Sequence, residues 1–140
     1  MAGRSVRFEV SAERAFDYLV DPRNRPEWQS SLRRVAEVTG EPRVGQRWID
    51  VTVPGPRPRM ETTVLERPHR WTEVGRWHGI HAELTLDVVT EGDGCRVRPS
   101  FTVTGRGVAA IPAYVVDKVA VLGVIPDLRR AAKLLADRAV

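Results

Sequence analysis

The spacing of apolar residues changes repeatedly along the chain, and each change predicts a new element of secondary structure. Residues 6–10 alternate apolar and charged side chains, which is typical of a strand with one buried face. Residues 12–19 then place apolar side chains at helical spacing behind Ser11, a favoured helix N-cap residue. The pair Asp21-Pro22 ends that helix and can cap a second short helix that reaches Trp28.

A long region of strand-like patterns follows the two predicted helices. The predicted strands cover residues 32–39, 46–53, 60–66, 70–76, 81–91 and 95–104. The tetrapeptides Trp-His-Gly-Ile and Glu-Gly-Asp-Gly separate the last three strands and are typical of tight hairpin turns. Pro99 cannot donate a backbone hydrogen bond, so it predicts a bulge or an edge position in the last strand.

The C-terminal part of the chain has a helical pattern with two apolar stripes that are out of phase. The first stripe contains Val115, Val119 and Leu122, and the second lies within residues 128–135. The phase changes at Pro126, and a proline ring with its missing N–H disturbs a helix. The sequence therefore predicts a kink at Pro126 or a break into two helices.

The first of these helical stretches, residues 107–126, is long enough to cross a membrane. Asp117 and Lys118 lie at its centre, where each charge costs about 2.5–3.5 kcal/mol on insertion scales. A helix packed against a sheet explains the same apolar stripe without that cost. We therefore expect no integral membrane span.

The predicted order is one strand, two short helices, about six strands and a long C-terminal helix. No strand–helix–strand alternation occurs, so the sheet should be antiparallel and the fold class α+β. A sheet of six to seven strands twists and curves, and one helix cannot fill its concave side. We therefore expect residues 1–140 to form a single domain, with a cavity for a small apolar ligand between sheet and C-terminal helix.

The charge of the chain does not identify a nucleic-acid-binding surface. The formal net charge is +4, from 22 Lys and Arg residues against 18 Asp and Glu residues. The arginines are scattered along the chain beside acidic residues, whereas a nucleic-acid site gathers basic residues on one face. We therefore predict no nucleic-acid partner.

Cysteine content and the first residues favour a cytoplasmic protein. Cys95 is the single cysteine, which excludes an internal disulfide framework and is typical of a reducing compartment. Residues 1–10 lack the succession of basic, apolar and small residues that marks a secretory leader. We therefore expect a cytoplasmic location.

Four segments resemble the SRPBCC superfamily, which includes START lipid-transfer domains, birch-pollen-allergen-like proteins and bacterial proteins of the polyketide cyclase/dehydrase type. The similar segments are VSAERAFDYLVDPRNRPEWQSSLRRV (10–35), VGQRW (44–48), VLERPHRW (64–71) and GDGCRVR (92–98). The resemblance implies a helix-grip fold, in which a curved antiparallel sheet of six to seven strands wraps around the C-terminal helix. It specifies fold better than function, because this fold carries binding proteins, sensors and enzymes.

Trp28 lies in a segment rich in arginine and proline, where ordinary loop chemistry does not require a tryptophan. The resemblance places it where the two short helices meet the sheet, near the mouth of a ligand tunnel. It either closes the tunnel over an apolar ligand or plugs that end of the core. Packing is the commoner role of a buried aromatic side chain, so the plug is the favoured interpretation.

His78, His81 and Cys95 offer no complete metal or nucleophilic site. Residues three apart on a strand point to opposite faces, and Gly79 makes the two histidines flank a turn. Zinc sites need three or four ligands, and no partner cysteine or carboxylate completes the set. Cys95 follows a turn without an obvious base, and no Gly-x-Ser-x-Gly motif occurs. We predict no metal, no cofactor and a packing role for Cys95.

Glu73 and Tyr114 are weak candidates for acid/base chemistry. Strand alternation places Glu73 on the same face as Trp71 and Trp77. If that face lines the cavity, desolvation raises the pKa of Glu73, and if it faces solvent Glu73 is an ordinary surface acid. Unpaired buried carboxylates are rare, so the surface interpretation is favoured. Tyr114 lies near the inward stripe of the last helix, whereas Arg98 alternates toward solvent.

The main functional interpretation is a protein that binds a hydrophobic small molecule, polyketide-like or lipid-like as the resemblance implies. The predicted lining residues are Trp28, Val51, Trp71, Trp77, Leu86, Phe101, Tyr114, Val115, Val119 and Leu122. The alternative is an enzyme of the polyketide cyclase/dehydratase type, which uses acid/base groups in the same cavity without a metal. A third interpretation is an interaction module whose cavity only stabilises the fold. The sequence leaves open whether the chain forms a homodimer.

Overall fold

The computed structural model describes residues 4–52, 55–105 and 113–138, and for residues 113–122 it describes the backbone alone. The elements in chain order are β1 (Val6–Phe8), α1 (Ala12–Val20), the 3₁₀ helix η1 (Pro22–Asn24), α2 (Arg25–Trp28), β2 (Leu32–Ala36), β3 (Arg47–Thr52), β4 (Arg59–Glu66), β5 (Arg70–Trp77), β6 (Ile80–Glu91), β7 (Gly94–Gly105) and α3 (Ala113–Arg138). Within these residues, seven strands form one antiparallel sheet in the order β1-β7-β6-β5-β4-β3-β2.

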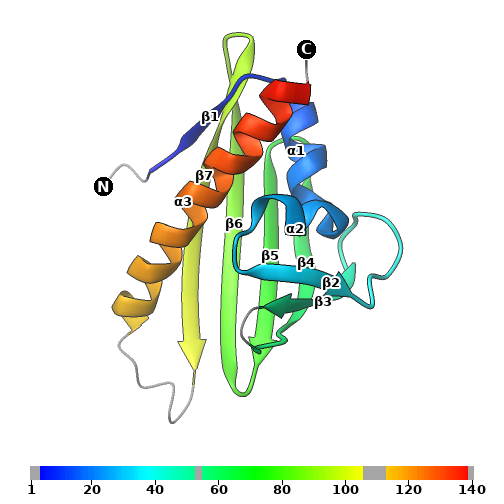
Figure 1. Ribbon diagram of the computed structural model, residues 1–140, viewed down its shortest axis with the longest axis vertical. Helices are drawn as coiled ribbons and strands as arrows, with labels where there is room; N and C mark the ends of the chain where they lie inside the picture. The colour runs from blue at the N-terminus through cyan, green and yellow to red at the C-terminus, as the bar shows by residue number, and fades with distance from the viewer. Residues whose placement is uncertain (1–3, 53–54, 106–112, 139–140) are drawn as a thin grey trace.

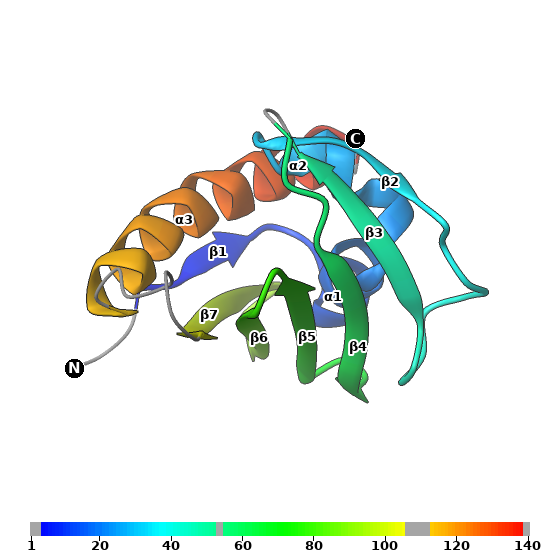
Figure 2. The ribbon, with the colours of Figure 1, turned by 90° about the horizontal axis from the view of Figure 1, so that it is seen from below.

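The helices lie on one side of a curved sheet. Figure 1 shows α3 crossing the sheet diagonally, with α1 and α2 beside its C-terminal end. Figure 2 shows that the sheet curves and that α3 lies on its concave side. This arrangement confirms the predicted α+β helix-grip fold, including the two short helices after the first strand.

Side-chain caps set the start of α1 and the turn that follows it. Ser11 Oγ accepts a hydrogen bond from the Arg14 N–H at 3.2 Å, as expected for an N-cap residue. Asp21 Oδ1 accepts a hydrogen bond from the Arg23 N–H at 3.0 Å, and Pro22 occupies the first position of η1. These local contacts turn the chain so that α2 lies over one end of the sheet.

The two predicted hairpin turns form where the glycines allow them. His78 and Gly79 have φ angles of 44° and 79° between β5 and β6, and Gly92 has a φ of 60° between β6 and β7. Left-handed backbone of this kind is typical of two-residue hairpin turns. Gly94 has a different role, because a Cβ there would overlap the carbonyl oxygen of Phe8. Glycine therefore lets β1 approach β7 closely at this point.

Pro99 lies in β7 opposite Leu86 of β6, with no shift in the register between the two strands. β1 pairs with β7 only at residues 95–97, so in the described sheet β7 is an edge strand beyond that point. On the β1 side of β7, Pro99 therefore has no neighbouring strand in the described sheet to which a backbone N–H would donate. The prediction of an edge position is confirmed.

α3 continues without a break through Pro126, so the predicted division into two helices is wrong. Pro126 is exposed, so its ring lies on the solvent side of the helix. Ile125, Leu128, Ala131 and Leu135 are buried and confirm the second apolar stripe. In the part of the chain that the structure describes, no helix combines the length and the hydropathy that a membrane crossing needs.

Glu27 of α2 joins the C-terminal end of α3 to α1. Glu27 Oε1 accepts hydrogen bonds from Tyr18 Oη at 2.8 Å and from Arg138 Nη1 at 3.2 Å. These hydrogen bonds lower the pKa of Glu27. The same contacts keep α2 and the end of α3 at a fixed separation over the sheet.

Candidate functional site

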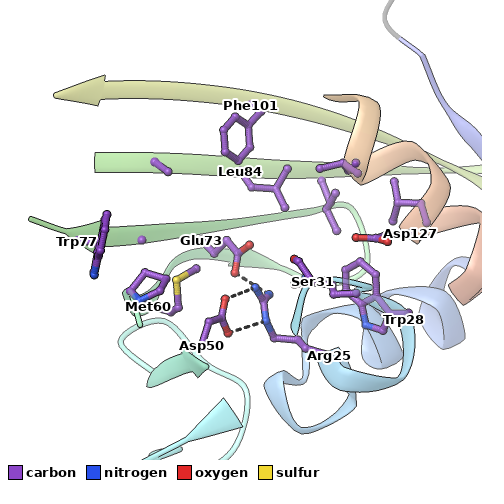
Figure 3. Close-up of a pocket in the computed structure, with 18 of the residues that line it drawn as sticks. Arg25, Trp28, Ser31, Asp50, Met60, Glu73, Trp77, Leu84, Phe101 and Asp127 are labelled. Carbon is purple, nitrogen blue, oxygen red and sulfur yellow. Dashed lines mark hydrogen bonds and ion pairs between the residues drawn. The ribbon is translucent and has the colours of Figure 1, made fainter. Parts of the chain in front are cut away.

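A cavity of about 390 Å³ lies between the concave face of the sheet, α2 and α3. Its wall is mostly apolar and is formed by Trp28, Pro58, Met60, Trp77, Ile80, Ala82, Leu84, Leu86, Phe101, Val124 and Leu128. Figure 3 shows Trp77 at one end, and Arg25, Asp50 and Glu73 together on the side that faces α2. The cavity is therefore a mostly apolar compartment with a buried ionic network on one side, and Gln29, Ser31 and Asp127 add polar groups to its wall.

Arg25 of α2 is the centre of that polar region and is only 2% exposed. Its Nε and Nη2 donate to the two carboxylate oxygens of Asp50 on β3, at 3.2 and 2.8 Å. Its Nη1 donates to Glu73 Oε2 on β5 at 2.7 Å. One guanidinium thus joins a helix to two strands through charge-assisted hydrogen bonds, the strong kind in a protein interior.

Trp48 contacts both Arg25 and Asp50 and so fixes the geometry of this network. Its indole Nε1 donates to Asp50 Oδ1 at 2.9 Å, so that this oxygen accepts two hydrogen bonds. The guanidinium carbon of Arg25 lies 5.3 Å from the centre of the Trp48 ring, within the range of a cation–π contact. The side chains of Arg25 and Asp50 are therefore held in one arrangement.

The network has one positive and two negative groups, and the excess negative charge helps to raise the pKa of Glu73. Burial raises the pKa of Glu73 to about 7, the Asp50 charge adds to the rise, and Arg25 opposes it. For Arg25, burial lowers the pKa, but the charges of Asp50 and Glu73 outweigh burial and raise it above its usual range. Arg25 is therefore always charged, whereas Glu73 can take up a proton near neutral pH.

One polar atom of this network is available to a bound molecule. The hydrogen bond from Arg25 engages only Oε2 of Glu73, and no other described residue donates to Oε1. The indole Nε1 of Trp28 has no acceptor among the described residues, but it is buried and is not accessible from the cavity. The cavity can therefore offer one acceptor, Glu73 Oε1, to the polar end of a ligand.

The structure separates the sequence-predicted lining residues into three groups. Trp28, Trp77, Leu86 and Phe101 line the cavity, and their role in binding stays a prediction. The described side chains do not include Tyr114, Val115, Val119 and Leu122, which lie outside the described residues. Trp71 and Val51 are buried but do not line the cavity.

Trp71 was expected on the cavity wall and instead packs in the core. It is fully buried, and its Nε1 donates to Thr62 Oγ1 at 3.1 Å on the neighbouring strand. Trp28 also packs in the core, as the plug interpretation predicts, while one side of its ring contributes to the cavity wall. Cys95 is fully buried, and burial raises the pKa of its thiol to about 11, which agrees with a packing role.

The interpretation of Glu73 as a surface acid is wrong, because Glu73 is 4% exposed. Its partner Arg25 lies 48 positions away in the sequence, on a helix, so strand alternation alone could not reveal the ion pair. Sequence reasoning also missed Asp50, which lies two residues after the buried Trp48 and therefore on the same face of β3. An acidic residue on the face of a tryptophan was the available signal.

Comparisons with known proteins agree with this architecture. A family model described as "Polyketide cyclase / dehydrase and lipid transport" matches residues 3–140. Among curated protein sequences, none matches this chain.

Three solved structures illustrate the similarity in fold. A conserved protein from Geobacillus kaustophilus has a TM-score of 0.73 at 19% identity, covering 95% of this chain and 93% of that one. XoxI from Bacillus cereus has a TM-score of 0.75 at 11% identity, covering 99% of this chain and 97% of that one. Ara h 8.0201 has a TM-score of 0.70 at 13% identity, covering 95% of each chain. At such identities these similarities concern the fold alone.

Proposed function

Because the chain belongs to the polyketide cyclase/dehydrase and lipid transport family, we propose that it binds a hydrophobic small molecule in the cavity beneath α3. The observation that carries this proposal is the cavity itself. Its volume of about 390 Å³ is within the range of small-molecule sites, and most of its wall is apolar. In this proposal residues 1–140 act as one cytoplasmic ligand-binding domain.

The polar region supports a ligand with one hydrogen-bonding group on an apolar body. An apolar body gains roughly 25 cal/mol for each Å² of surface that it removes from water. Glu73 Oε1 can accept a hydrogen bond from a hydroxyl group, and burial makes an unmet hydrogen bond there costly. A long-chain alcohol such as dodecanol therefore has the chemistry of a suitable probe.

Gly75 offers a direct test, because it lines the cavity and carries no side chain. A Cβ there would lie 2.8 Å from Met60 Sδ, so a leucine must displace the flexible Met60 side chain, which also lines the cavity. We expect Gly75→Leu to weaken dodecanol binding at least about tenfold in isothermal titration calorimetry, because the added side chain occupies ligand space.

The matched control for this test is Val89→Phe, which adds similar bulk at a side chain that is 60% exposed. This variant should bind dodecanol as the wild type does. Native mass spectrometry of the freshly purified protein would show in parallel whether a molecule is already bound. A folded Gly75→Leu variant with unchanged affinity would contradict the assignment of the binding site.

A second candidate function, catalysis on the bound molecule, is favoured by one specific observation. Glu73 combines an available oxygen on the cavity side with a pKa of about 7, the value that suits a general base at neutral pH. Its carboxylate could remove a proton from a carbon beside a carbonyl group, as cyclisation or dehydration of a polyketide requires. Arg25 would stay in place as the counter-ion of the carboxylate.

The catalytic candidate predicts that the protein accelerates deuterium exchange at the carbon atoms beside the carbonyl of methyl decyl ketone. General-base catalysis contributes about 10²–10⁴-fold, so the exchange rate above buffer should be easily measured by mass spectrometry. Glu73→Gln should lose the acceleration, and Glu73→Asp should retain part of it. Binding of the ketone without faster exchange would leave the protein a binding protein only.

A further inference from the structure

The charged groups on the cavity wall are not balanced. Within the part of the chain that the structure describes, the wall contains one cation, Arg25, and three carboxylates, which belong to Asp50, Glu73 and Asp127. The chain as a whole has the opposite balance, with a formal net charge of +4. The cavity is therefore an acidic interior in a basic protein, and an attraction for cations there cannot come from the overall charge.

The buried ionic network lacks one positive charge. Arg25 donates to both carboxylate oxygens of Asp50 but to only one oxygen of Glu73. Glu73 is 4% exposed, and Figure 3 shows one of its oxygens directed at Arg25 and the other pointing away from it. On the neighbouring strands the residues opposite Glu73 are Thr62 and Leu84, which carry no charge. A carboxyl group buried in this way needs a second cation or a proton.

A proton meets this need in the protein alone, because burial raises the pKa of Glu73 to about 7. A cationic group of a ligand beside Glu73 Oε1 would meet the same need while Arg25 stays in place. It would hold Glu73 in its ionised form, and the network would then have two positive and two negative groups.

Asp127 adds a negative charge from the helix side of the cavity. It belongs to α3, and its Oδ1 accepts a hydrogen bond from the Ser30 N–H at 3.2 Å. This donor is neutral and leaves the negative charge of Asp127 in place. An anionic ligand would therefore add a further negative charge between the sheet and α3, whereas a cationic ligand would be attracted from both sides.

We propose that the cavity ligand is an amphipathic amine, whose apolar body lies against the apolar wall and whose ammonium group donates a hydrogen bond to Glu73 Oε1. This inference rests on the proposed binding function and adds the chemical class of the ligand and the position of its charged group. An ammonium group suits the position, because it has three donors and its hydrogen bond to a carboxylate is charge-assisted.

The test compares three probes with the same alkyl chain in isothermal titration calorimetry at pH 8: dodecylamine, dodecanol and dodecanoate. A primary amine, like that of lysine, has a pKa of about 10.4 and is charged at this pH. The wild type should bind dodecylamine at least about tenfold more tightly than dodecanol, and dodecanoate more weakly than dodecanol. Unspecific attraction to a protein of net charge +4 would favour dodecanoate instead, so this order identifies the cavity.

Glu73→Gln should reduce the preference for dodecylamine over dodecanol at least about fivefold, because an amide cannot neutralise an ammonium group. The matched control is Glu83→Gln, which removes one exposed carboxylate from β6. Glu83 adjoins Leu84 of the cavity wall in the sequence, so its side chain lies on the other face of the sheet. This control should keep the full preference.

Binding of the amine should also displace the proton of Glu73. The charged groups around Glu73 are Arg25 on α2, Asp50 on β3 and Asp127 on α3, and no histidine is among the described residues that line the cavity. From pH 6 to pH 8 the wild type should bind dodecylamine about tenfold more tightly as Glu73 loses its proton. At pH 7, titrations in phosphate and Tris buffers should show release of about half a proton, which Glu73→Gln should not show.

The failures of this experiment can be told apart. Dodecanol binding by the wild type without a preference for dodecylamine would overturn the amine as ligand and leave the proposed binding function intact. An equal preference for dodecylamine in the wild type and in Glu73→Gln would overturn the assignment of the ammonium site to Glu73. Absence of binding by all three probes would overturn the proposed function, and this inference with it.

Discussion

Replacing Arg25 by methionine should destabilise the protein by about 3–5 kcal/mol, which is the range for breaking a buried ion pair by removing one partner. The substitution keeps an unbranched side chain but removes the guanidinium group, and it leaves Asp50 and Glu73 buried without their counter-ion. It also removes three charge-assisted hydrogen bonds. Urea unfolding followed by circular dichroism at neutral pH measures the change in the free energy of unfolding.

The matched control is Arg67→Met, because Arg67 makes an equally close two-point contact with Asp17 at 2.7 and 2.9 Å on the surface. An exposed ion pair contributes about 0–1 kcal/mol, so this control should change the free energy of unfolding little. A cost for Arg25→Met no larger than that for Arg67→Met would contradict the buried network. The two-point contacts of Arg25 with Asp50 and of Arg67 with Asp17 have similar geometry, and Arg25 differs in its burial and in its further hydrogen bond to Glu73.

The origin of the loss can be separated from packing with the variant Arg25→Met/Asp50→Asn/Glu73→Gln. This variant has no buried charge, and the large cost of breaking a buried ion pair comes from the uncompensated charge that remains. We therefore expect it to recover most of the stability that Arg25→Met loses. If the triple variant were as unstable as the single one, the loss would come from packing around residue 25 and not from the unpaired carboxylates.

The elements that the sequence predicted best are those specified by local contacts. Ser11 caps α1 through an atom three residues away, and Gly92 provides the turn between β6 and β7. Pro126 was also judged locally, and the predicted break into two helices did not occur. Packing of α3 against β1 and β7 holds the helix together, and an exposed position lets the proline ring face solvent.

The polar network could not be predicted because its three members come from α2, β3 and β5. Alternation on β5 correctly placed Glu73 on the face of Trp77, but it carries no information about what covers that face. The assumption that a buried carboxylate would lack a partner then favoured the wrong interpretation. Arg25 supplies that partner through a tertiary contact.

Trp71 illustrates a second limit of pattern analysis. Trp71 and Trp77 share one face of β5, yet only Trp77 lines the cavity, because the cavity occupies one part of the sheet and packed side chains fill the rest. Alternation determines the face of a strand on which a residue lies. The position of a cavity along that strand depends on where α1 and α3 cover the sheet, which the sequence pattern does not give.

The wild-type protein should become less stable as the pH rises from about 4.5 to about 7, because the buried Glu73 must give up its proton over this range. The pKa of this carboxyl is about 7 in the folded protein and 4.5 as the ordinary value, so the folded state binds the proton more tightly than the unfolded chain. Its stabilising effect is complete below pH 4.5 and is lost as the pH rises through 7. At 1.36 kcal/mol for each pKa unit, the loss is about 3 kcal/mol.

Glu73→Gln isolates this effect, because glutamine cannot ionise and keeps the shape of the side chain. Urea unfolding at several values between about pH 4.5 and pH 8 should show the wild type losing about 3 kcal/mol relative to this variant as the pH rises. Glu91→Gln is a control of opposite sign, since hydrogen bonds from Arg96 and Arg7 lower the pKa of Glu91 to about 2. Relative to Glu91→Gln, the wild type should lose stability only as the pH falls from about 4.5 toward 2, so the profiles of these two proteins should stay parallel between pH 4.5 and pH 8.

Parallel pH profiles for the wild type and Glu73→Gln would mean that Glu73 titrates as an ordinary acid, and the catalytic candidate would lose its support. A profile with the expected slope would mean that both forms of Glu73 are populated near neutral pH. The ionised form accepts a hydrogen bond from a ligand, and the protonated form can donate one. The same buried carboxyl could then anchor a hydroxyl group in a binding protein or exchange a proton with a substrate in an enzyme, and the ketone exchange experiment separates these two uses.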